Sequence, residues 1–121
     1  FYLGARVSEG SATTIFYKIH IPTMKVTAKL QSMPSSAWGY FPQLVHDTKR
    51  NRLVFLGSKI LVYSLSANTW SDVTPSGWIN YEHINGVYQP TIDAIFFRGI
   101  PVGSNDTLSD GFEWHRIKFN D

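Results

Sequence analysis

Cysteine is absent from this chain of 121 residues. Disulfide frameworks, zinc ribbons and thiol chemistry are therefore excluded. The absence is more typical of cytosolic proteins, although an extracellular location also permits it. Long apolar runs are missing as well. No segment approaches the roughly 18 residues that a membrane-spanning helix requires, so we expect no membrane partner.

An excess of charge of one sign is also lacking, because 11 Lys and Arg face 9 Asp and Glu for a net charge of +2. The basic residues are scattered, and their tightest group is Lys49-Arg50-Asn51-Arg52. Nucleic-acid-binding proteins usually carry a denser basic face. We therefore interpret this group as the solvated tip of a hairpin and expect no nucleic-acid partner.

Recognisable catalytic motifs are the third absence. The chain has neither a Gly-x-Ser-x-Gly elbow nor a phosphate-binding glycine loop. The four histidines lie far apart, without the close spacing of a metal motif, and hydrogen-bonded structural roles are the simpler interpretation. We expect no catalytic residue, no metal and no cofactor, and we favour binding over enzymatic activity.

Aromatic residues are abundant, at 15% of the chain, which favours strands. Three apolar segments, residues 1–5, 54–58 and 96–100, contain a glycine at the same position, and these glycines are 53 and 42 residues apart. A second set of apolar segments follows them at residues 16–19, 62–65 and 114–117. A third match relates residues 34–40 to 75–81. Repetition at about 20–50 residues is typical of solenoids and propellers.

The middle repeat indicates four strands at residues 41–46, 52–56, 60–65 and from 70 onward, joined by polar turns at 47–51 and 66–69. A repeated four-stranded meander is a propeller blade. The sequence thus predicts an all-β fold, a partial β-propeller of about two and a half four-stranded antiparallel blades. The predicted units are an incomplete blade at 1–33, a full blade at 34–74 and an incomplete blade at 75–121.

The middle repeat resembles a kelch repeat, in which strand B ends in a glycine pair, strand C carries a Tyr and strand D begins near a Trp. Gly57, Tyr63 and Trp70 match that pattern. Leu56 replaces the first glycine of the pair, and Met24 stands where the first repeat should have its Trp. The same region also resembles the F-box-associated domain, another propeller-like adaptor, and one blade does not separate the two families.

The alternating strand directions place the B–C and D–A connections on one side of a blade, and the kelch resemblance implies that this side binds partners. We therefore predict a partner-binding surface that contains five residues from the D–A links and the start of the next strand, namely Trp38, Tyr40, Trp78, Tyr81 and His83. The alternative is that the aromatic residues pack between blades. Asn105-Asp106-Thr107 is a glycosylation sequon, although such triplets also arise by chance.

The resemblance implies a protein–protein interaction module that presents loops to a partner or substrate protein. A carbohydrate-binding propeller and a non-catalytic part of a propeller enzyme are the alternatives. Propellers usually close with about 4–8 blades. Because two and a half blades leave apolar ends such as Phe1, Trp114 and Phe119, we expect further blades of a parent chain or a second copy to cover them.

Overall fold

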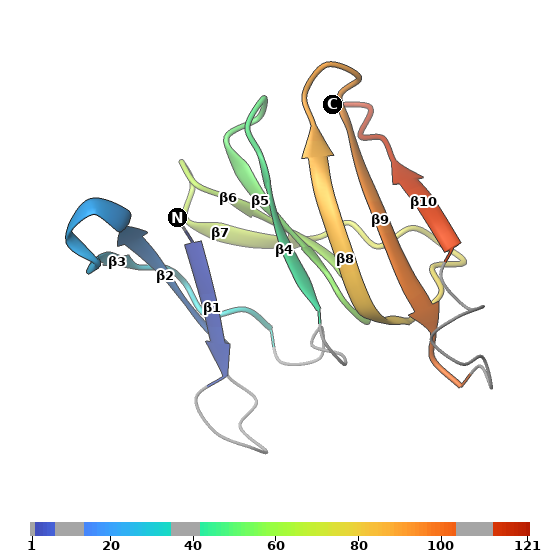
Figure 1. The fold of residues 1–121 in the computed structure, drawn as a ribbon, viewed down its shortest axis with the longest axis horizontal. Coiled ribbons are helices and arrows are strands. Elements are labelled where there is room, and N and C mark those ends of the chain that lie inside the picture. The colour runs from blue at the N-terminus through green and yellow to red at the C-terminus, as the bar shows by residue number, and fades with distance from the viewer. Residues whose placement is uncertain (1, 7–13, 35–41, 104–112) are drawn as a thin grey trace.

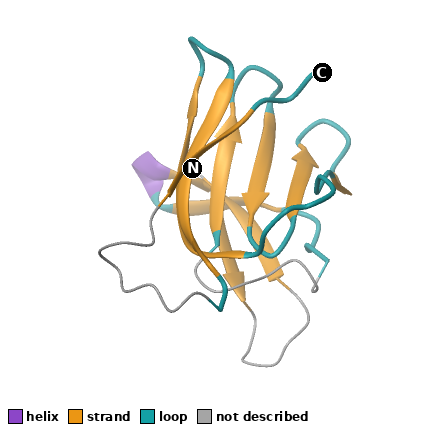
Figure 2. Cartoon of the chain, turned by 90° about the vertical axis from the view of Figure 1, so that its right-hand side faces the viewer, coloured by secondary structure: helices purple, strands orange, loops and turns teal. Residues whose placement is uncertain are grey.

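The computed structural model of the chain describes residues 2–6, 14–34, 42–103 and 113–121. These residues form ten β-strands, and their only helix is the single 3-10 turn η1, Ile21–Thr23. All strand pairings are antiparallel. The perpendicular view in Figure 2 shows how strands dominate the molecule. The predicted all-β class is confirmed.

The strands form three separate meander sheets, which lie side by side in Figure 1. The first sheet has the order β1 (Tyr2–Arg6), β2 (Thr14–His20), β3 (Lys25–Lys29). The middle sheet has the order β4 (Gln43–Asp47), β5 (Arg52–Leu56), β6 (Ile60–Ser64), β7 (Thr69–Asp72). The third sheet comprises β8 (Tyr81–Gln89), β9 (Ala94–Pro101) and β10 (Glu113–Ile117). None closes into a barrel, and three stacked meanders are the arrangement of a partial β-propeller.

The two central strands of the middle sheet, β5 and β6, are buried on both faces. Side chains alternate between the two faces of a strand, so one set from β5 and β6 faces each neighbouring sheet. Val54 and Leu56 pack in a core with the third sheet, where Ile95 and Phe97 are nearly inaccessible. Phe55 belongs to a second core with the first sheet. This double burial explains why β5 reads as a continuous apolar run rather than an alternating one.

Four hairpins share one loop design. Each loop has four residues between paired strand ends, and the last loop residue has a positive φ. These residues are Met24 (51°), Asn51 (49°), Asn68 (57°) and Asp93 (50°). Asn and Asp tolerate the left-handed region better than other non-glycine residues. Met24 is the exception, and its side chain is 75% exposed, so it gains little packing in return.

The strand register corrects one repeat match. Leu53 of β5 and Ile95 of β9 are each the second residue after their A–B loops, and they pair with Tyr63 and Ile117 respectively. Ile117 therefore holds the place of Tyr63 in the third sheet, whereas sequence spacing assigned that place to His115. The spacing was misleading because the B–C loops differ in length. His115 and Ile117 are two residues apart and lie on the same face of β10, so the apolar pattern alone does not distinguish them.

The same correction applies to the first sheet. Val26 pairs with Ile19 one step after the β2–β3 loop, as Trp70 pairs with Tyr63 one step after the β6–β7 loop. Val26 thus occupies the Trp position that sequence spacing gave to Met24. In the first sheet, Ile19 and Val26 therefore occupy the places that Tyr63 and Trp70 occupy in the middle sheet.

Candidate functional site

Three of the predicted binding residues are described by the structure, and they differ in exposure. Tyr81 is only 5% exposed, Trp78 is partly buried, and His83 is exposed. Trp38, Tyr40 and the sequon residue Asn105 lie outside the described residues. Only Trp78 and Tyr81 are brought together.

Trp78 and Tyr81 belong to an aromatic cluster between the middle and third sheets. Their ring centroids are 5.4 Å apart, and each ring lies 5.6 Å from that of Phe97. His115 of β10 stacks on Phe97 at 5.0 Å and contacts Tyr81 at 4.9 Å. The Trp78 indole Nε1–H donates a hydrogen bond of 3.3 Å to the carbonyl oxygen of Gly57. Tyr81 therefore packs between the sheets, as the alternative interpretation of these aromatics proposed.

A groove of about 460 Å³ opens beside this cluster. One wall is the segment of residues 73–79 that leaves β7, and the other is β10 with residues 118–119. Its floor is aromatic and aliphatic, and its described lining residues are Ile60, Val73, Pro75, Ser76, Gly77, Trp78, Ile79, Tyr81, Phe97, His115, Arg116, Ile117, Lys118 and Phe119. The rim of the groove remains open to solvent at Ile79, which is 51% exposed.

The β10 wall of the groove is basic. Arg116 and Lys118 are both exposed, and no Asp or Glu is among the described residues that line the groove. Neither cation forms an ion pair with a carboxylate in the described part of the chain. An aromatic floor beside two solvated cations favours a ligand that combines apolar and acidic groups.

The groove also borders a strand edge. In the third sheet, β10 is the last strand of the order β10-β9-β8, whereas its counterpart in the middle sheet, β6, is covered by β7. Among the described residues, the outer edge of β10 is therefore not paired with a strand. A strand edge presents backbone N–H and C=O groups that can pair with a further strand.

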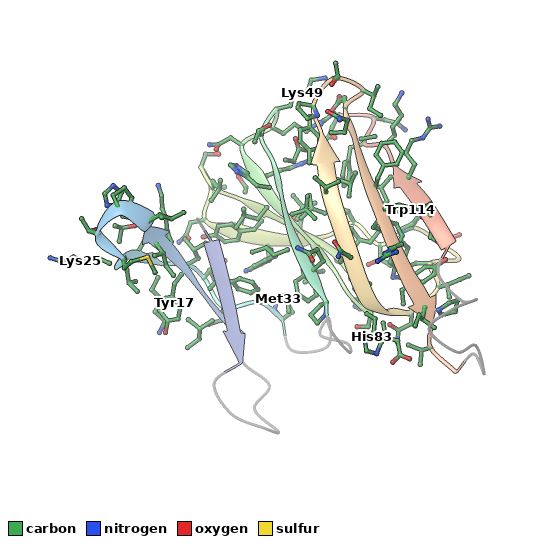
Figure 3. All side chains as sticks on the ribbon, in the orientation of Figure 1. Tyr17, Lys25, Met33, Lys49, His83 and Trp114 are labelled. Carbon is green, nitrogen blue, oxygen red and sulfur yellow. The ribbon has the colours of Figure 1, made fainter. Side chains whose placement is uncertain are left out.

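His83 lies away from the groove. It is exposed near the beginning of β8, where the pairing with β9 shifts register between Glu82 and Asn85 (Figure 3). Its φ of 52° is in the left-handed region, which His adopts more readily than most residues. It does not line the groove with Trp78 and Tyr81.

An ion-pair network that the sequence analysis did not predict lies at the end of the blades opposite His83, where Lys49 is labelled in Figure 3. The Arg50 guanidinium donates to both carboxylate oxygens of Asp93, at 2.7 and 2.9 Å. Both Arg50 and Arg52 donate to Asp47, whose side chain is 0% exposed. With side chains 13% and 11% exposed, Arg50 and Arg52 are not the solvated tip that the sequence suggested.

The network joins three segments. Arg50 links the A–B turn of the middle sheet to that of the third sheet through Asp93, and Arg52 pairs with Asp121. The Arg52 guanidinium also lies 4.3 Å from the Phe119 ring centroid. Hydrogen bonds from Arg50 hold the pKa of Asp93 below its ordinary value, and those from Arg52 lower the pKa of Asp121. The cluster fixes how two blades and residues 118–121 are held together.

The described residues contain no group of three or more His, Asp or Glu side chains placed to hold a metal ion. Within the same residues, no helix has the length and apolar character needed to cross a membrane. Comparisons with protein-family models, with curated proteins and with solved structures found no match to this chain.

Proposed function

We propose that this chain is a protein-interaction module of a β-propeller, and that the groove between residues 73–79 and β10 receives a segment of a partner protein. Trp78 and Tyr81 are part of the proposed binding site, and Tyr81 contributes to the floor of the groove rather than serving as an exposed anchor. His83 is not part of it.

One observation carries this proposal: an apolar groove is bordered by the exposed cations Arg116 and Lys118. Interface cores are enriched in aromatic residues and Arg, which matches Trp78 and Arg116. A polypeptide segment satisfies both features at once, because its apolar side chains fill the floor and its acidic groups meet the rim.

The test uses exposed charges, whose substitution leaves the core intact. A random peptide library is selected for binding to the chain, and the selected peptides are measured by fluorescence polarisation against Arg116→Glu/Lys118→Glu. We expect selected peptides to be acidic and to bind this variant at least about tenfold more weakly, since two attractive charges become repulsive.

The matched control is Lys25→Glu/Lys29→Glu, which makes the same charge change at two exposed residues of β3, a strand on the opposite side of the molecule from β10 (Figure 1). Its net charge equals that of the groove variant, so any general electrostatic effect cancels. If both variants weaken binding equally, or if neither does, the groove is not the binding site.

A further inference from the structure

The first blade carries positive charge that no described carboxylate balances. Its described residues, 2–6 and 14–34, include neither Asp nor Glu, and their exposed lysines are Lys18, Lys25 and Lys29. None of these lysines forms an ion pair with a carboxylate in the part of the chain that the structure describes. In the middle sheet, by contrast, Lys59 pairs with Asp72 at 3.0 Å. The first blade is therefore the described region best suited to attract an anion.

Part of this charge lines a pocket of about 480 Å³ on the β2–β3 hairpin, and the lining residues are Lys18, Ile19, His20, Ile21, Pro22 and Thr27. Lys18 and His20 alternate along β2 with Phe16, so the three side chains share one face of the strand. Phe16 packs against Phe55 of the middle sheet. The face that carries Lys18 and His20 therefore has a described neighbour, and both side chains are exposed in its presence.

The hairpin holds the polar side chains of the pocket in place. β3 contains one extra residue, Thr27, opposite the step from Lys18 to Ile19, and such a bulge redirects side chains. The Thr27 hydroxyl donates a hydrogen bond of 3.1 Å to the carbonyl oxygen of Lys18. In η1, the Thr23 hydroxyl oxygen lies 2.9 Å from His20 Nδ1. This contact orients the imidazole, so Nε2 is the ring nitrogen that can donate to a ligand.

The donors of this pocket match the acceptors of a phosphate group. The Lys18 ammonium has three N–H donors, and the His20 imidazole donates from Nε2 when that nitrogen carries a proton. A phosphate monoester carries about 1.5–2 negative charges near pH 7 and has three acceptor oxygens. A carboxylate carries a single charge on two oxygens. A phosphate group thus offers one oxygen to each of Lys18, His20 and Thr27.

We propose that the pocket formed by Lys18, His20 and Thr27 binds a phosphate group. This site is separate from the groove at β10, which lies on the opposite side of the molecule (Figure 1), and it does not depend on the proposed function. A free phosphate and the phosphorylated headgroup of a lipid present the same chemistry. Ile21 and Met24 of the hairpin are 58% and 75% exposed, and a lipid would contact such apolar side chains whereas a free ion would not.

The first test is a nuclear magnetic resonance titration of the 121-residue chain with inorganic phosphate at constant ionic strength, with acetate as the comparison anion. We expect phosphate to shift the amide signals of Lys18, His20 and Thr27 in a saturable way, and acetate to bind at least about tenfold more weakly. Lys18→Gln should weaken phosphate binding at least about tenfold, because a charge-assisted hydrogen bond is lost.

The matched control is Lys29→Gln, which removes the same charge from an exposed residue of the same hairpin that does not line the pocket. It should weaken phosphate binding less than about twofold, because a distant exposed charge is screened. Equal weakening by Lys18→Gln and Lys29→Gln, or equal binding of acetate and phosphate, identifies an adventitious ion only and overturns the proposal. Arg116→Glu/Lys118→Glu should bind phosphate as the unsubstituted chain does, so failure of either proposal leaves the other standing.

Vesicles identify the source of the phosphate group. The chain is sedimented with phosphatidylcholine vesicles that contain either a phosphoinositide or phosphatidylserine at the same total negative charge. Retention by the phosphoinositide vesicles alone, lowered at least about tenfold by Lys18→Gln, supports the site and identifies a lipid headgroup. Binding of inorganic phosphate without retention supports the site and identifies a soluble ligand. If inorganic phosphate does not bind and both kinds of vesicle retain the chain equally, only general charge attracts them and the phosphate site is refuted.

Discussion

Trp70 connects the first and middle sheets, and its truncation measures how strongly they are held together. The indole contacts the rings of Phe16 and Tyr63, and its Nε1–H donates a 2.9 Å hydrogen bond to the carbonyl oxygen of Gln31. These contacts cross from one blade to the next. Trp70→Ala therefore removes an inter-blade interaction together with part of the core around Leu61.

The expected cost follows from these contacts. Replacing a fully buried Trp by Ala costs about 3–5 kcal/mol, and Trp70 is only partly buried. A hydrogen bond of about 1 kcal/mol and two aromatic contacts of roughly 0.5–1.5 kcal/mol each give an expected loss of about 2–4 kcal/mol. Trp70→Phe keeps most of the ring contact and should lose about 1 kcal/mol, mainly the hydrogen bond.

Urea unfolding followed by far-ultraviolet circular dichroism measures these losses without relying on the fluorescence of the substituted residue. Trp114→Ala is the matched control, since Trp114 is 69% exposed on β10 and should change the unfolding free energy by less than about 0.5 kcal/mol. If Trp70→Ala and Trp114→Ala give the same unfolding free energy, Trp70 does not stabilise the contact between the first and middle sheets.

Two further predictions concern the ion-pair network and a close backbone approach. Because the folded-state pKa of Asp93 lies below its unfolded value, its contribution to stability is complete above about pH 4 and is lost as the pH falls through the lowered pKa. Asp93→Asn tolerates the same positive φ, so its thermal midpoint should fall less between pH 4 and pH 2 than that of the unsubstituted chain; parallel curves would contradict the role of this carboxylate. Gly99→Ala places a Cβ 3.0 Å from the Tyr81 Cβ, and we expect overpacking to cost about 1–3 kcal/mol in urea unfolding. A stabilised Gly99→Ala variant would show instead that the neighbouring strand moves easily.

Local pattern was sufficient to predict the strands of the middle sheet. The apolar run at β5, the polar turn before it and the Tyr and Trp beyond it predicted four strands, and the structure places β4 to β7 there. Burial of Tyr63, at 1% exposed, follows from the same pattern. These features depend on residues close together in sequence, which is why periodicity and turn residues predict them.

Long loops and distant partners limited the rest of the prediction. Spacing counted across a B–C loop could not fix the register, and the Trp equivalent in the first sheet was placed at Met24 rather than Val26. Besides the nearby Asp47, Arg50 and Arg52 pair with Asp93 and Asp121, which are 43 and 69 residues away, and a local pattern does not reveal these distant partners. In the candidate site, the aromatic character of Trp78 was informative, but the basic rim depends on how β10 aligns with its neighbours.

Two apolar residues near the end of the third repeat, Trp114 and Phe119, differ in their burial. Trp114 is exposed, as expected for an uncovered end, whereas Phe119 packs against the core between the middle and third sheets. Sequence identified both as apolar residues near the end of the third repeat. The Arg52 guanidinium over the Phe119 ring shows why they differ, because contacts from the middle sheet hold residues 118–121 in place.

Every described strand pairing joins strands that are neighbours in sequence, and this has a kinetic consequence. Such hairpins close small loops and form within about 1–10 μs, without waiting for distant parts of the chain. The contacts that couple the sheets, such as Trp70 with Phe16 and Arg50 with Asp93, span more than 40 residues. We therefore expect each sheet to nucleate by itself, and the docking of one sheet on the next to be the slow, cooperative step of folding.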